Sequence, residues 1–545
     1  MGETLEFRSR RSPVYSSRGM VAASQPLAVQ AGLSILGQGG NAADAAVAVA
    51  AALGVTEAFS TGLGGDCFAL FYEARSRCVT ALNGSGRAPA ALTLERVLQE
   101  GFKDGIPGNH AHGITVPGAC AGWFDLIERH GALDMAQILA PAIHLADEGF
   151  PVAPLTARFW GQAAQGKLDE RRGGGQLLIN GRAPRPGEMM RMPSLASTMR
   201  SIAEAGKRAF YEGPIAERIV AAARAFGGVM TEEDLAEHVS TWEKPISVVC
   251  REVRVHECPP NGQGLAALIA LNILSRLGLS SLGEALSAPR LHHAVEAMRL
   301  AFADARRYVA DPAFAEIPLS GLLSPEYAAE RAKRIDPRRA NPDQPYGIPP
   351  RGAGGDTVYF TTADGQGNVC SFVNSLSHPF GTGIAPDGLG FALQNRGQGF
   401  SLEPGHPNAL EPRKRPYHTI IAGMATRESD GSAYAGFGCM GGFMQPQGHV
   451  QLILGLLEDG LDPQAALDRP RFCLAEGEAR GDLALEEGIP VSAMAGLAEM
   501  GHRVRLVSGL GRRVFGRGQI ILRDSSNGVL CGGSDPRADG CVAGI

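Results

Sequence analysis

The sequence predicts a mixed α/β (α+β) fold in which helices and strands are interleaved along the chain. Apolar residues have helical spacing over 25–36, and a second helical segment over 42–53 is followed at once by a hairpin pattern. Residues from about 133 to 308 are mostly helical in pattern, and a linker over 341–355 separates them from two strand-like runs. At 545 residues, the chain should form two lobes or one large compact unit.

The first two helices carry clear local signals. Leu27, Ala31 and Ile35 lie on one face of the first helix, which ends at a glycine-rich segment. Asn41 is predicted to cap the second helix, and Asp44 lies in its first turn, where a negative charge is favourable.

A glycine turn and a hairpin follow these helices. The turn is TGLGGD over 61–66, and the strands are expected over 67–72 and 79–82. Farther along the chain, 289–308 has an apolar stripe at helical spacing, so the middle of the chain is interpreted as a helical scaffold.

The clearest linker, NPDQPYGIPPRGAGG over 341–355, is too rich in Pro and Gly for a helix or an inner strand. Two strands, TVYFTTAD and VCSFVNSL, are then joined by the turn GQGN, and Thr357 is the first residue of the first strand. Later segments are predicted to be a strand over 433–438, a glycine turn over 440–443 and a helix over 450–457.

The composition is that of an ordinary soluble globular protein, with 44% hydrophobic and 20% charged residues and a net charge of -5. Nucleic acid is therefore not expected as a partner. No apolar run is long enough to cross a membrane, since the best candidate, Ala42–Val55, is too short. Arg8, Arg10 and Arg11 precede no apolar stretch of the kind that a secretion signal needs, so a cytoplasmic protein is expected.

The position of Thr357 suggests a chemical role. A threonine hydroxyl is a weak nucleophile, but an N-terminal threonine can use its own α-amine, with a pKa of about 7.7–8.0, as the base. An internal threonine must first be exposed by cleavage. The glycine-rich approach to Asp356 would let the Thr357 hydroxyl reach the preceding carbonyl carbon, so self-cleavage between Asp356 and Thr357 is predicted.

The glycine pair Gly441–Gly442 can supply backbone N–H donors to an oxyanion, because no side chain blocks the approach. A competing interpretation is a dinucleotide-binding fingerprint formed by Gly436, Gly438 and Gly441, with Glu458 about 20 residues beyond. The fingerprint is disfavoured because no second apolar strand follows the predicted helix.

Other catalytic signatures do not occur in the sequence. It contains no G-x-S-x-G, P-loop or H-E-x-x-H motif, and its ten cysteines form no C-x-x-C pair. No metal and no cofactor are therefore expected. Single histidines such as His418 and His449 are more often structural than catalytic.

Several long stretches resemble one family across nearly the whole chain. They are GMVAASQPLAVQAGLSILGQGGNAADAAVAVAAALGVTEAFSTGLGGD, ITVPGACAGWFDL, GGDTVYFTTADGQGNVCSF, FGTGIAPDGLGFALQNRGQGFS, MGGFMQPQGHVQ and GGSDPRADGCVAGI. They are similar to the gamma-glutamyltransferase (glutathione hydrolase) proenzymes. The resemblance implies an N-terminal nucleophile hydrolase with a four-layer αββα sandwich, cleaved into a large subunit, 1–356, and a small subunit, 357–545.

The resemblance assigns roles to individual residues. Thr357 corresponds to the nucleophile, and Gly441 with Gly442 corresponds to the oxyanion hole. Ser375 stands where the family has a second threonine that supports the amine of the nucleophile, and it keeps the hydroxyl. Asn395 matches the family's asparagine before the amino-acid clamp.

The departures fall on groups that would hold the α-amino and α-carboxylate groups of a glutamyl substrate. Arg396 and Gly399 stand where typical members have a Gln or Glu and an Asp. His418 and Thr419 replace a serine pair, and Ser377 replaces an asparagine. Arg396, His418 and Thr419 are still expected to bind the substrate, but its ammonium group loses its acidic partner.

Two further differences concern the groups that hold the substrate and the lid over the site. Ser85 replaces an arginine that typical members carry, and the nearest arginine is Arg87, which is taken as the substrate-binding candidate. Most of a lid loop is missing between Phe400 and Arg415, so a more open site is expected. These features resemble the YwrD-like branch and the relatives that act as cephalosporin or glutaryl acylases or as oxamate amidohydrolase.

Three functions remain open at this stage. Hydrolysis or transfer of gamma-glutamyl groups from glutathione or related amides is the default of the family, but the altered clamp predicts slow turnover at best. Acylase or small-amide (oxamate-type) hydrolysis is the alternative, and an uncleaved scaffold is the third. The expected partners are a small-molecule amide and the two subunits of one precursor, which could form a dimer of heterodimers.

Overall fold

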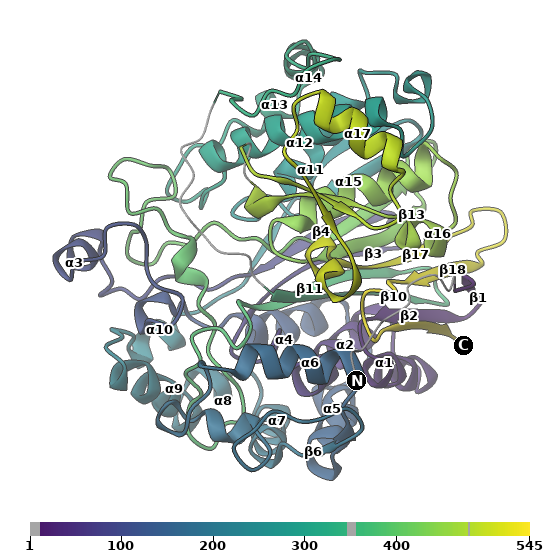
Figure 1. Ribbon diagram of the computed structural model, residues 1–545. Coiled ribbons are helices and arrows are strands. Elements are labelled where there is room, and N and C mark those ends of the chain that lie inside the picture. Colours follow the sequence, from purple (N-terminus) through teal and green to yellow (C-terminus); the bar gives the residue numbers. More distant parts are fainter. Residues whose placement is uncertain (1–10, 346–355, 478–479) are drawn as a thin grey trace.

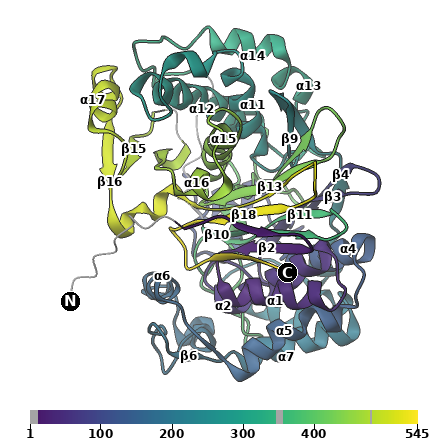
Figure 2. The same ribbon diagram turned by 90° about the vertical axis from the view of Figure 1, so that its right-hand side faces the viewer.

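The computed structural model describes residues 11–345, 356–477 and 480–545 of the uncleaved chain. In this part of the chain two seven-stranded sheets pack against each other, and helices cover the outer face of each sheet (Figures 1 and 2). The layers therefore follow the order helix, sheet, sheet, helix, which is the four-layer αββα sandwich that the resemblance implied. Most of the predicted linker over 341–355 lies outside the described residues.

The first sheet has the order β1-β18-β17-β13-β12-β9-β8. Its strands are β1 (Val14–Ser16), β8 (Ile246–Cys250), β9 (Val253–Glu257), β12 (Gly423–Arg427), β13 (Ala433–Met440), β17 (Arg517–Arg523) and β18 (Leu530–Ser534). All the neighbouring pairs are antiparallel.

The second sheet has the order β19-β2-β10-β11-β3-β4-β7. Its strands are β2 (Gly19–Ala23), β3 (Asp66–Glu73), β4 (Cys78–Gly84), β7 (Thr241–Glu243), β10 (Asp356–Asp364), β11 (Val369–Ser377) and β19 (Cys541–Gly544). Strands that precede the predicted cleavage point in sequence pair with strands that follow it. β10 pairs with β2, and β11 pairs with β3. The predicted subunits are thus interwoven in one unit rather than separated into two lobes.

Helices form the two outer layers. One layer, against the second sheet, includes α1 (Pro26–Gly37), α2 (Ala42–Thr56), α4 (Ala119–His130) and α5 (Met135–Glu148). The other, over the first sheet, includes α11 (Gly264–Leu274), α12 (Ala288–Tyr308), α15 (Met444–Leu457) and α16 (Pro463–Asp468). Peripheral helices are α3 (Leu94–Gln99), α6 (Pro154–Ala164), α7 (Pro193–Ala205), α8 (Arg208–Tyr211), α9 (Pro214–Ala225), α10 (Glu232–Ala236), α13 (Leu319–Leu322), α14 (Pro325–Ala332) and α17 (Val491–Glu499).

Two small sheets lie outside the sandwich. One pairs β5 (Phe150–Pro151) with β6 (Met189–Met190), and the other has the order β14 (Phe472–Leu474), β15 (Leu483–Glu486) and β16 (Val504–Val507). In Figure 2 the second small sheet and α17 lie to one side of the main sandwich. No helix of the described residues is long and apolar enough to cross a membrane.

The predicted cap of α2 is confirmed. The Asn41 side chain accepts hydrogen bonds from the N–H groups of Ala43 and Asp44, and the Asp44 carboxylate accepts one from the Asn41 N–H at 2.7 Å. This reciprocal pair satisfies N–H groups that the first turn of a helix leaves without partners. The helix can therefore be buried along its whole length beneath β10 and β11.

The sequence analysis missed five strands in the middle of the chain, and three of them, β7, β8 and β9, belong to the two large sheets. β7 forms one edge of the second sheet, while β8 and β9 form a hairpin at one edge of the first. The turn of this hairpin places Arg251 at φ 55°, a left-handed conformation that usually calls for Gly or Asn. Without that signal, the short strands could not be distinguished from the surrounding helical pattern.

The helix predicted over 450–457 begins earlier, at Met444, and Met440 belongs to β13 rather than to the glycine turn. The first turns of α15 carry polar side chains that are nonetheless buried, so the apolar periodicity starts late. Gln447, for example, accepts a hydrogen bond from the Leu474 N–H at 2.7 Å and donates to the Leu474 carbonyl at 3.2 Å.

The glycines of the dinucleotide-like fingerprint have a packing role. Gly436 and Gly438 lie inside β13, where a Cβ atom at either position would collide with the facing sheet. At Gly436 it would meet the Thr361 hydroxyl, and at Gly438 it would lie 2.5 Å from the Tyr359 ring. Close approach of the two sheets explains these glycines, and the fingerprint interpretation is not needed.

Candidate active site

The Thr357 hydroxyl lies beside the Ser375 hydroxyl at the end of the β10–β11 pair. The two oxygens are 3.2 Å apart, and both residues are fully buried in the uncleaved chain. Asp356 pairs with Ser377, but Val358 pairs with Asn374, so a bulge in β11 lies opposite Thr357. Bulges of this kind re-aim side chains and are frequent next to active sites.

Ser375 receives hydrogen bonds from two other groups. Its Oγ accepts from the Ser377 N–H at 2.9 Å and from Nη2 of Arg396 at 3.2 Å. In the hydrogen bond between Ser375 and Thr357, either hydroxyl can be the donor. Ser377 has φ 76°, a strained backbone conformation for a residue other than glycine. In this conformation its N–H reaches Ser375 Oγ.

Arg396 brings a positive charge to within hydrogen-bond reach of this pair. Besides Ser375, its guanidinium group donates to Thr419 Oγ1 at 2.8 Å through Nη1, and the residue is only 2% exposed. Its Nε has no hydrogen-bond partner among the described residues. Burial lowers the pKa of Arg396 to about 10, and nearby Asp66 opposes that fall, so the group stays charged at neutral pH.

Asp66 is the acidic group nearest in this network, and its oxygens are already engaged. Oδ1 accepts hydrogen bonds from the N–H groups of Gly86 and Gly118 and from the Gln394 amide, at 3.0, 3.2 and 2.9 Å. Oδ2 lies 3.0 Å from Nε2 of His418. Asp66 also pairs directly with Ser375 across β3 and β11, so it supports the site from behind.

His418 is held as a neutral ring. Burial and the Arg396 charge lower its pKa to about 3, against the favourable effect of Asp66. Its Nε2–H can then donate to Asp66, while Nδ1 accepts from the Ile420 N–H at 3.4 Å. Both ring nitrogens therefore have hydrogen-bond partners within the fold.

The glycine pair forms a sharp turn between β13 and α15. Gly441 has φ 131° and Gly442 has φ 59°, conformations that a residue with a Cβ atom rarely adopts. Gln263 supports the turn, because its amide donates to the carbonyl oxygens of Gly442 at 2.9 Å and of Thr419 at 2.5 Å. This side chain thus ties the glycine turn to the segment that Arg396 contacts.

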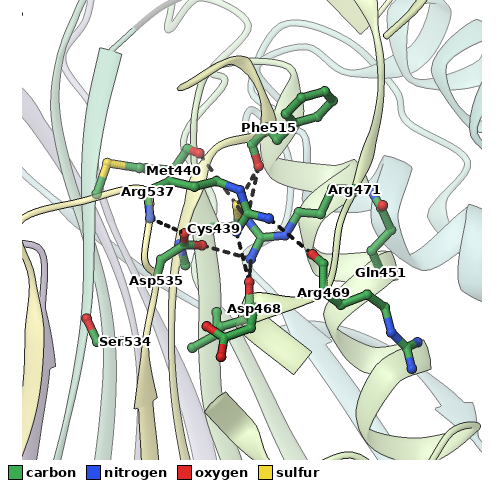
Figure 3. Close-up of polar contacts among 12 residues, drawn as sticks. Cys439, Met440, Gln451, Asp468, Arg469, Arg471, Phe515, Ser534, Asp535 and Arg537 are labelled. Carbon is green, nitrogen blue, oxygen red and sulfur yellow. Dashed lines mark hydrogen bonds and ion pairs between the residues drawn. The ribbon is translucent and has the colours of Figure 1, made fainter. Parts of the chain in front are cut away.

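A buried ionic network lies beside Cys439, near the end of β13 (Figure 3). Arg471 bonds Asp535 at 2.8 Å and the Phe515 carbonyl at 3.0 Å, and its Nη1 lies 3.6 Å from Cys439 Sγ. Arg537 bonds the other Asp535 oxygen at 3.0 Å. Burial alone would raise the pKa of Asp535, but the two guanidinium groups and nearby backbone N–H groups hold it below its usual value.

Two candidates from the sequence have other surroundings. Arg87 is partly exposed and donates to the Val239 carbonyl at 3.2 Å, and no contact with Thr357, Ser375 or Arg396 is found in the described chain. Asn395 is buried and uses its amide in the fold. Its Nδ2 donates to the Gly108 carbonyl at 2.7 Å, and its Oδ1 accepts from the His378 N–H at 3.1 Å.

Three residues of the site were not identified from the sequence: Asp66, Gln263 and Arg415. Asp66 ends the TGLGGD turn, so an acid directly after a glycine turn was an available signal. Arg415 is buried and donates to the Ser85 carbonyl at 3.1 Å. Ser85 stands where the resemblance places an arginine in typical members, so Arg415 brings a guanidinium group close to that position. No local pattern marked Gln263 or Arg415.

One group among the described residues has the composition of a metal site, and it consists of His292, Glu296 and His502. Both nitrogens of His292 are already hydrogen-bonded, to His502 at 2.8 Å and to the Asp336 carbonyl at 2.8 Å. Arg299 lies 3.2 Å from Glu296, so a cation already balances that carboxylate. These contacts explain the cluster without an ion.

The chain is similar to known proteins over nearly its whole length. The family model described as Gamma-glutamyltranspeptidase matches residues 28–545. The chain belongs to this family. The chain is 36% identical over 539 residues to the glutathione hydrolase-like YwrD proenzyme of Bacillus subtilis, with 98% of this chain and 99% of that protein covered.

Two other relatives have different activities in their names. The oxamate amidohydrolase proenzyme of Klebsiella pneumoniae is 35% identical, with 97% of this chain and 99% of that protein covered. The crystal structure of a cephalosporin acylase from Bacillus halodurans superimposes with a TM-score of 0.92 at 44% identity, covering 100% and 99% of the two chains. The chain is thus an enzyme of the N-terminal nucleophile hydrolase fold, among relatives named as hydrolases and acylases.

Proposed function

We propose that the chain cleaves itself before Thr357 and that the mature enzyme hydrolyses amides whose acyl group ends in a carboxylate. Thr357 is the nucleophile, Ser375 supports it, and Gly441 with Gly442 forms the oxyanion hole. The observation that carries the proposal is the buried Arg396 guanidinium group, one hydrogen bond away from Ser375, which itself lies 3.2 Å from the Thr357 hydroxyl.

Self-cleavage follows from the position of the hydroxyl. Thr357 Oγ1 adds to the carbonyl carbon of Asp356, the bond from that carbon to the Thr357 nitrogen breaks, and the hydroxyl proton ends on the nitrogen. Water then hydrolyses the ester, which releases the Asp356 carboxyl group and restores the hydroxyl. The hydrogen bond from Ser375 stabilises negative charge that develops on Thr357 Oγ1.

Catalysis repeats this chemistry on a substrate. The free α-amine of Thr357 takes the hydroxyl proton as Oγ1 adds to the amide carbonyl carbon, and the oxyanion is stabilised at the glycine turn. The proton passes to the leaving amine as the carbon–nitrogen bond breaks, which leaves an ester on Thr357. Water hydrolyses the ester to the carboxylic acid and regenerates the enzyme.

The charges around Arg396 support an anionic acyl group. A buried guanidinium group attracts a carboxylate through paired N–H donors and repels an ammonium group. Asp66 offers little to an ammonium group, because its oxygens already receive hydrogen bonds from Gly86, Gly118, Gln394 and His418. Oxamate and glutaryl amides share the required feature, since the acyl group of each ends in a carboxylate.

Gamma-glutamyl amides are the second candidate, because several relatives are named as glutathione hydrolases. Their α-carboxylate suits Arg396, but their α-ammonium group would be left without an acidic partner. Burying the ammonium charge without a partner costs free energy, so we expect slow turnover of these substrates.

We also infer a reducing compartment such as the cytoplasm, because all ten cysteines are free thiols. Association of two cleaved heterodimers into a larger assembly stays a prediction. Light scattering of the processed protein tests it.

Two measurements test the proposed function. Denaturing gels and N-terminal sequencing of purified protein should give a fragment that begins at Thr357. Thr357→Ala should leave the chain uncut and inactive, whereas Thr357→Ser, which keeps a hydroxyl, should still be cut. Normal processing of Thr357→Ala would contradict the assignment.

The substrate class is tested with p-nitroanilides that differ only in the acyl group. We expect glutaryl-p-nitroanilide to exceed both butyryl- and gamma-glutamyl-p-nitroanilide in kcat/KM by at least about tenfold, the effect of roughly 1.4 kcal/mol. Oxamate hydrolysis is measured beside them through ammonia release. Rapid gamma-glutamyl turnover would show that the charge argument is wrong.

A further inference from the structure

Gln263 is a buried glutamine whose side chain joins two parts of the candidate active site. Its Nε2 donates to the Gly442 carbonyl at 2.9 Å and to the Thr419 carbonyl at 2.5 Å. Its Oε1 accepts a hydrogen bond from the Tyr417 hydroxyl at 3.1 Å. Two carbonyl oxygens therefore meet the donor end of the amide, and a hydroxyl meets the acceptor end. These partners give the amide one orientation.

The backbone of Gln263 is also held in place. Gln263 lies directly before α11, and its carbonyl accepts a hydrogen bond from the Ala266 N–H at 2.9 Å. Its own N–H donates to the His418 carbonyl at 3.0 Å. Because main-chain bonds fix the residue at the end of a buried helix, its side chain can act as a rigid support for a more flexible segment.

The glycine turn is such a segment. Gly441 has φ 131° and Gly442 has φ 59°, and residues without a Cβ atom change their backbone angles at little steric cost. The Gly441 carbonyl accepts from the Met444 N–H at 3.0 Å, and the Gly442 carbonyl accepts from the Gln445 N–H at 3.2 Å. The Gln263 amide adds a shorter hydrogen bond to the Gly442 carbonyl. Rotation of the peptide unit that begins at this carbonyl would break that bond.

The orientation of the turn matters for the proposed chemistry. Backbone N–H groups stabilise an oxyanion most when they already point at it before the charge develops. The same Gln263 amide also holds Thr419, whose hydroxyl accepts the hydrogen bond from Arg396. The glycine pair and the guanidinium group are thus linked through one buried side chain.

We propose that Gln263 is a positioning residue, which holds Gly441 and Gly442 in the orientation that stabilises the oxyanion. The proposal rests on the proposed function, in which the glycine pair forms the oxyanion hole. Gln263 acts through the Gly442 carbonyl and not by contact with the reacting atoms. Its loss should therefore weaken the binding of a tetrahedral adduct and have little effect on the binding of an acyl carboxylate.

The test compares two inhibitors of the processed enzyme that share this carboxylate. In 4-boronobutanoate, boron replaces the reacting carbonyl carbon of a glutaryl group. Thr357 Oγ1 adds to the boron and its proton passes to the α-amine, which gives a tetrahedral anion like the one formed in catalysis. Glutarate remains planar at the corresponding carbon and forms no adduct.

Gln263→Met keeps the length of the side chain and removes the amide. The inhibition constant of 4-boronobutanoate should rise about tenfold in this variant, and that of glutarate should stay within about twofold. An inhibition constant does not depend on the fraction of active enzyme, so a variant that only folds less well would leave both values unchanged. The kcat values for glutaryl- and butyryl-p-nitroanilide should fall by a similar factor, because both substrates form the same oxyanion.

Tyr417→Phe is a second, milder variant, which removes the hydroxyl that orients the Gln263 amide and keeps the ring. It should raise the inhibition constant of 4-boronobutanoate about threefold and serves as the test if Gln263→Met is not processed. Gln451→Met is the matched control. The Gln451 amide also donates to two backbone carbonyls, those of Gln447 and Phe472, both at 3.0 Å, and these lie outside the glycine turn. Both inhibition constants should stay within about twofold in this control.

Equal rises for 4-boronobutanoate and glutarate in Gln263→Met would overturn the proposal, because they would show a general loss of the site. An unchanged inhibition constant for 4-boronobutanoate in Gln263→Met, or in Tyr417→Phe where that variant serves as the test, would overturn it as well. Failure of the proposed function would show differently, since glutarate would then inhibit the wild-type enzyme no better than butyrate.

Discussion

Replacing Arg396 by glutamine isolates the charge that we assign to acyl recognition. The guanidinium group is buried, donates to Ser375 at 3.2 Å and to Thr419 at 2.8 Å, and has an Nε without a partner in the described chain. Glutamine keeps an N–H donor but removes the charge. The variant should therefore lose the contact with a substrate carboxylate while retaining part of the support to Ser375.

The magnitude follows from the contacts at stake. A hydrogen bond to a charged partner contributes about 1.5–3 kcal/mol, so the loss of a carboxylate bound through two N–H groups should cost about 3–4 kcal/mol. That range corresponds to a decrease of roughly 10²- to 10³-fold in kcat/KM for glutaryl-p-nitroanilide. Butyryl-p-nitroanilide has no carboxylate on its acyl group. For this substrate the variant should lose only the support that Arg396 gives to Ser375, about 1 kcal/mol, which lowers kcat/KM roughly fivefold.

The assay is the ratio of the two kcat/KM values, normalised to the amount of the fragment that begins at Thr357. Normalisation removes any effect of Arg396→Gln on processing, and the ratio removes any uniform effect on the nucleophile. Arg208→Gln serves as a control, since Arg208 pairs with Glu212 on the surface and its loss should leave the ratio unchanged. Equal losses for both substrates in Arg396→Gln would refute recognition of the acyl carboxylate by this residue.

Two further predictions concern stability. Asp535→Asn should lower the free energy of unfolding by about 3–5 kcal/mol, because Arg471 would keep its buried charge without the carboxylate that it pairs with, although Arg537 would still pair with Glu486. The exposed Asp387→Asn should change the free energy of unfolding by less than about 0.5 kcal/mol. Urea denaturation measures both, and a loss below about 1 kcal/mol for Asp535→Asn would contradict the assigned role of the network. His418 has a folded pKa of about 3 against 6.5 for the free side chain, so between these values the unfolded chain binds an extra proton and stability falls as the pH falls. The wild-type protein should therefore lose about 2 kcal/mol more than His418→Gln between pH 6.5 and 4.5, and parallel pH profiles would show that His418 is not held neutral.

The sequence alone determined the features that depend on neighbouring residues. The cap formed by Asn41 and Asp44, the hairpin of β3 and β4, and the strand that begins beside Thr357 are all encoded within a few residues, so their patterns were sufficient. The family resemblance supplied the layered fold. The short strands β7, β8 and β9 were missed because their pairing partners lie far away in sequence, and the start of α15 was missed because buried polar side chains interrupt its apolar pattern.

Only the tertiary structure decided the electrostatics of the site. Ser375 and Arg396 were singled out from the sequence, but their hydrogen bond joins a strand to a later 3₁₀ helix, and no local pattern fixes such a contact. Asp66 meets His418 from a position 352 residues away, and those hydrogen bonds leave the carboxylate little capacity to receive an ammonium group. Charge and solvation depend on which groups are buried together, and folding alone establishes that.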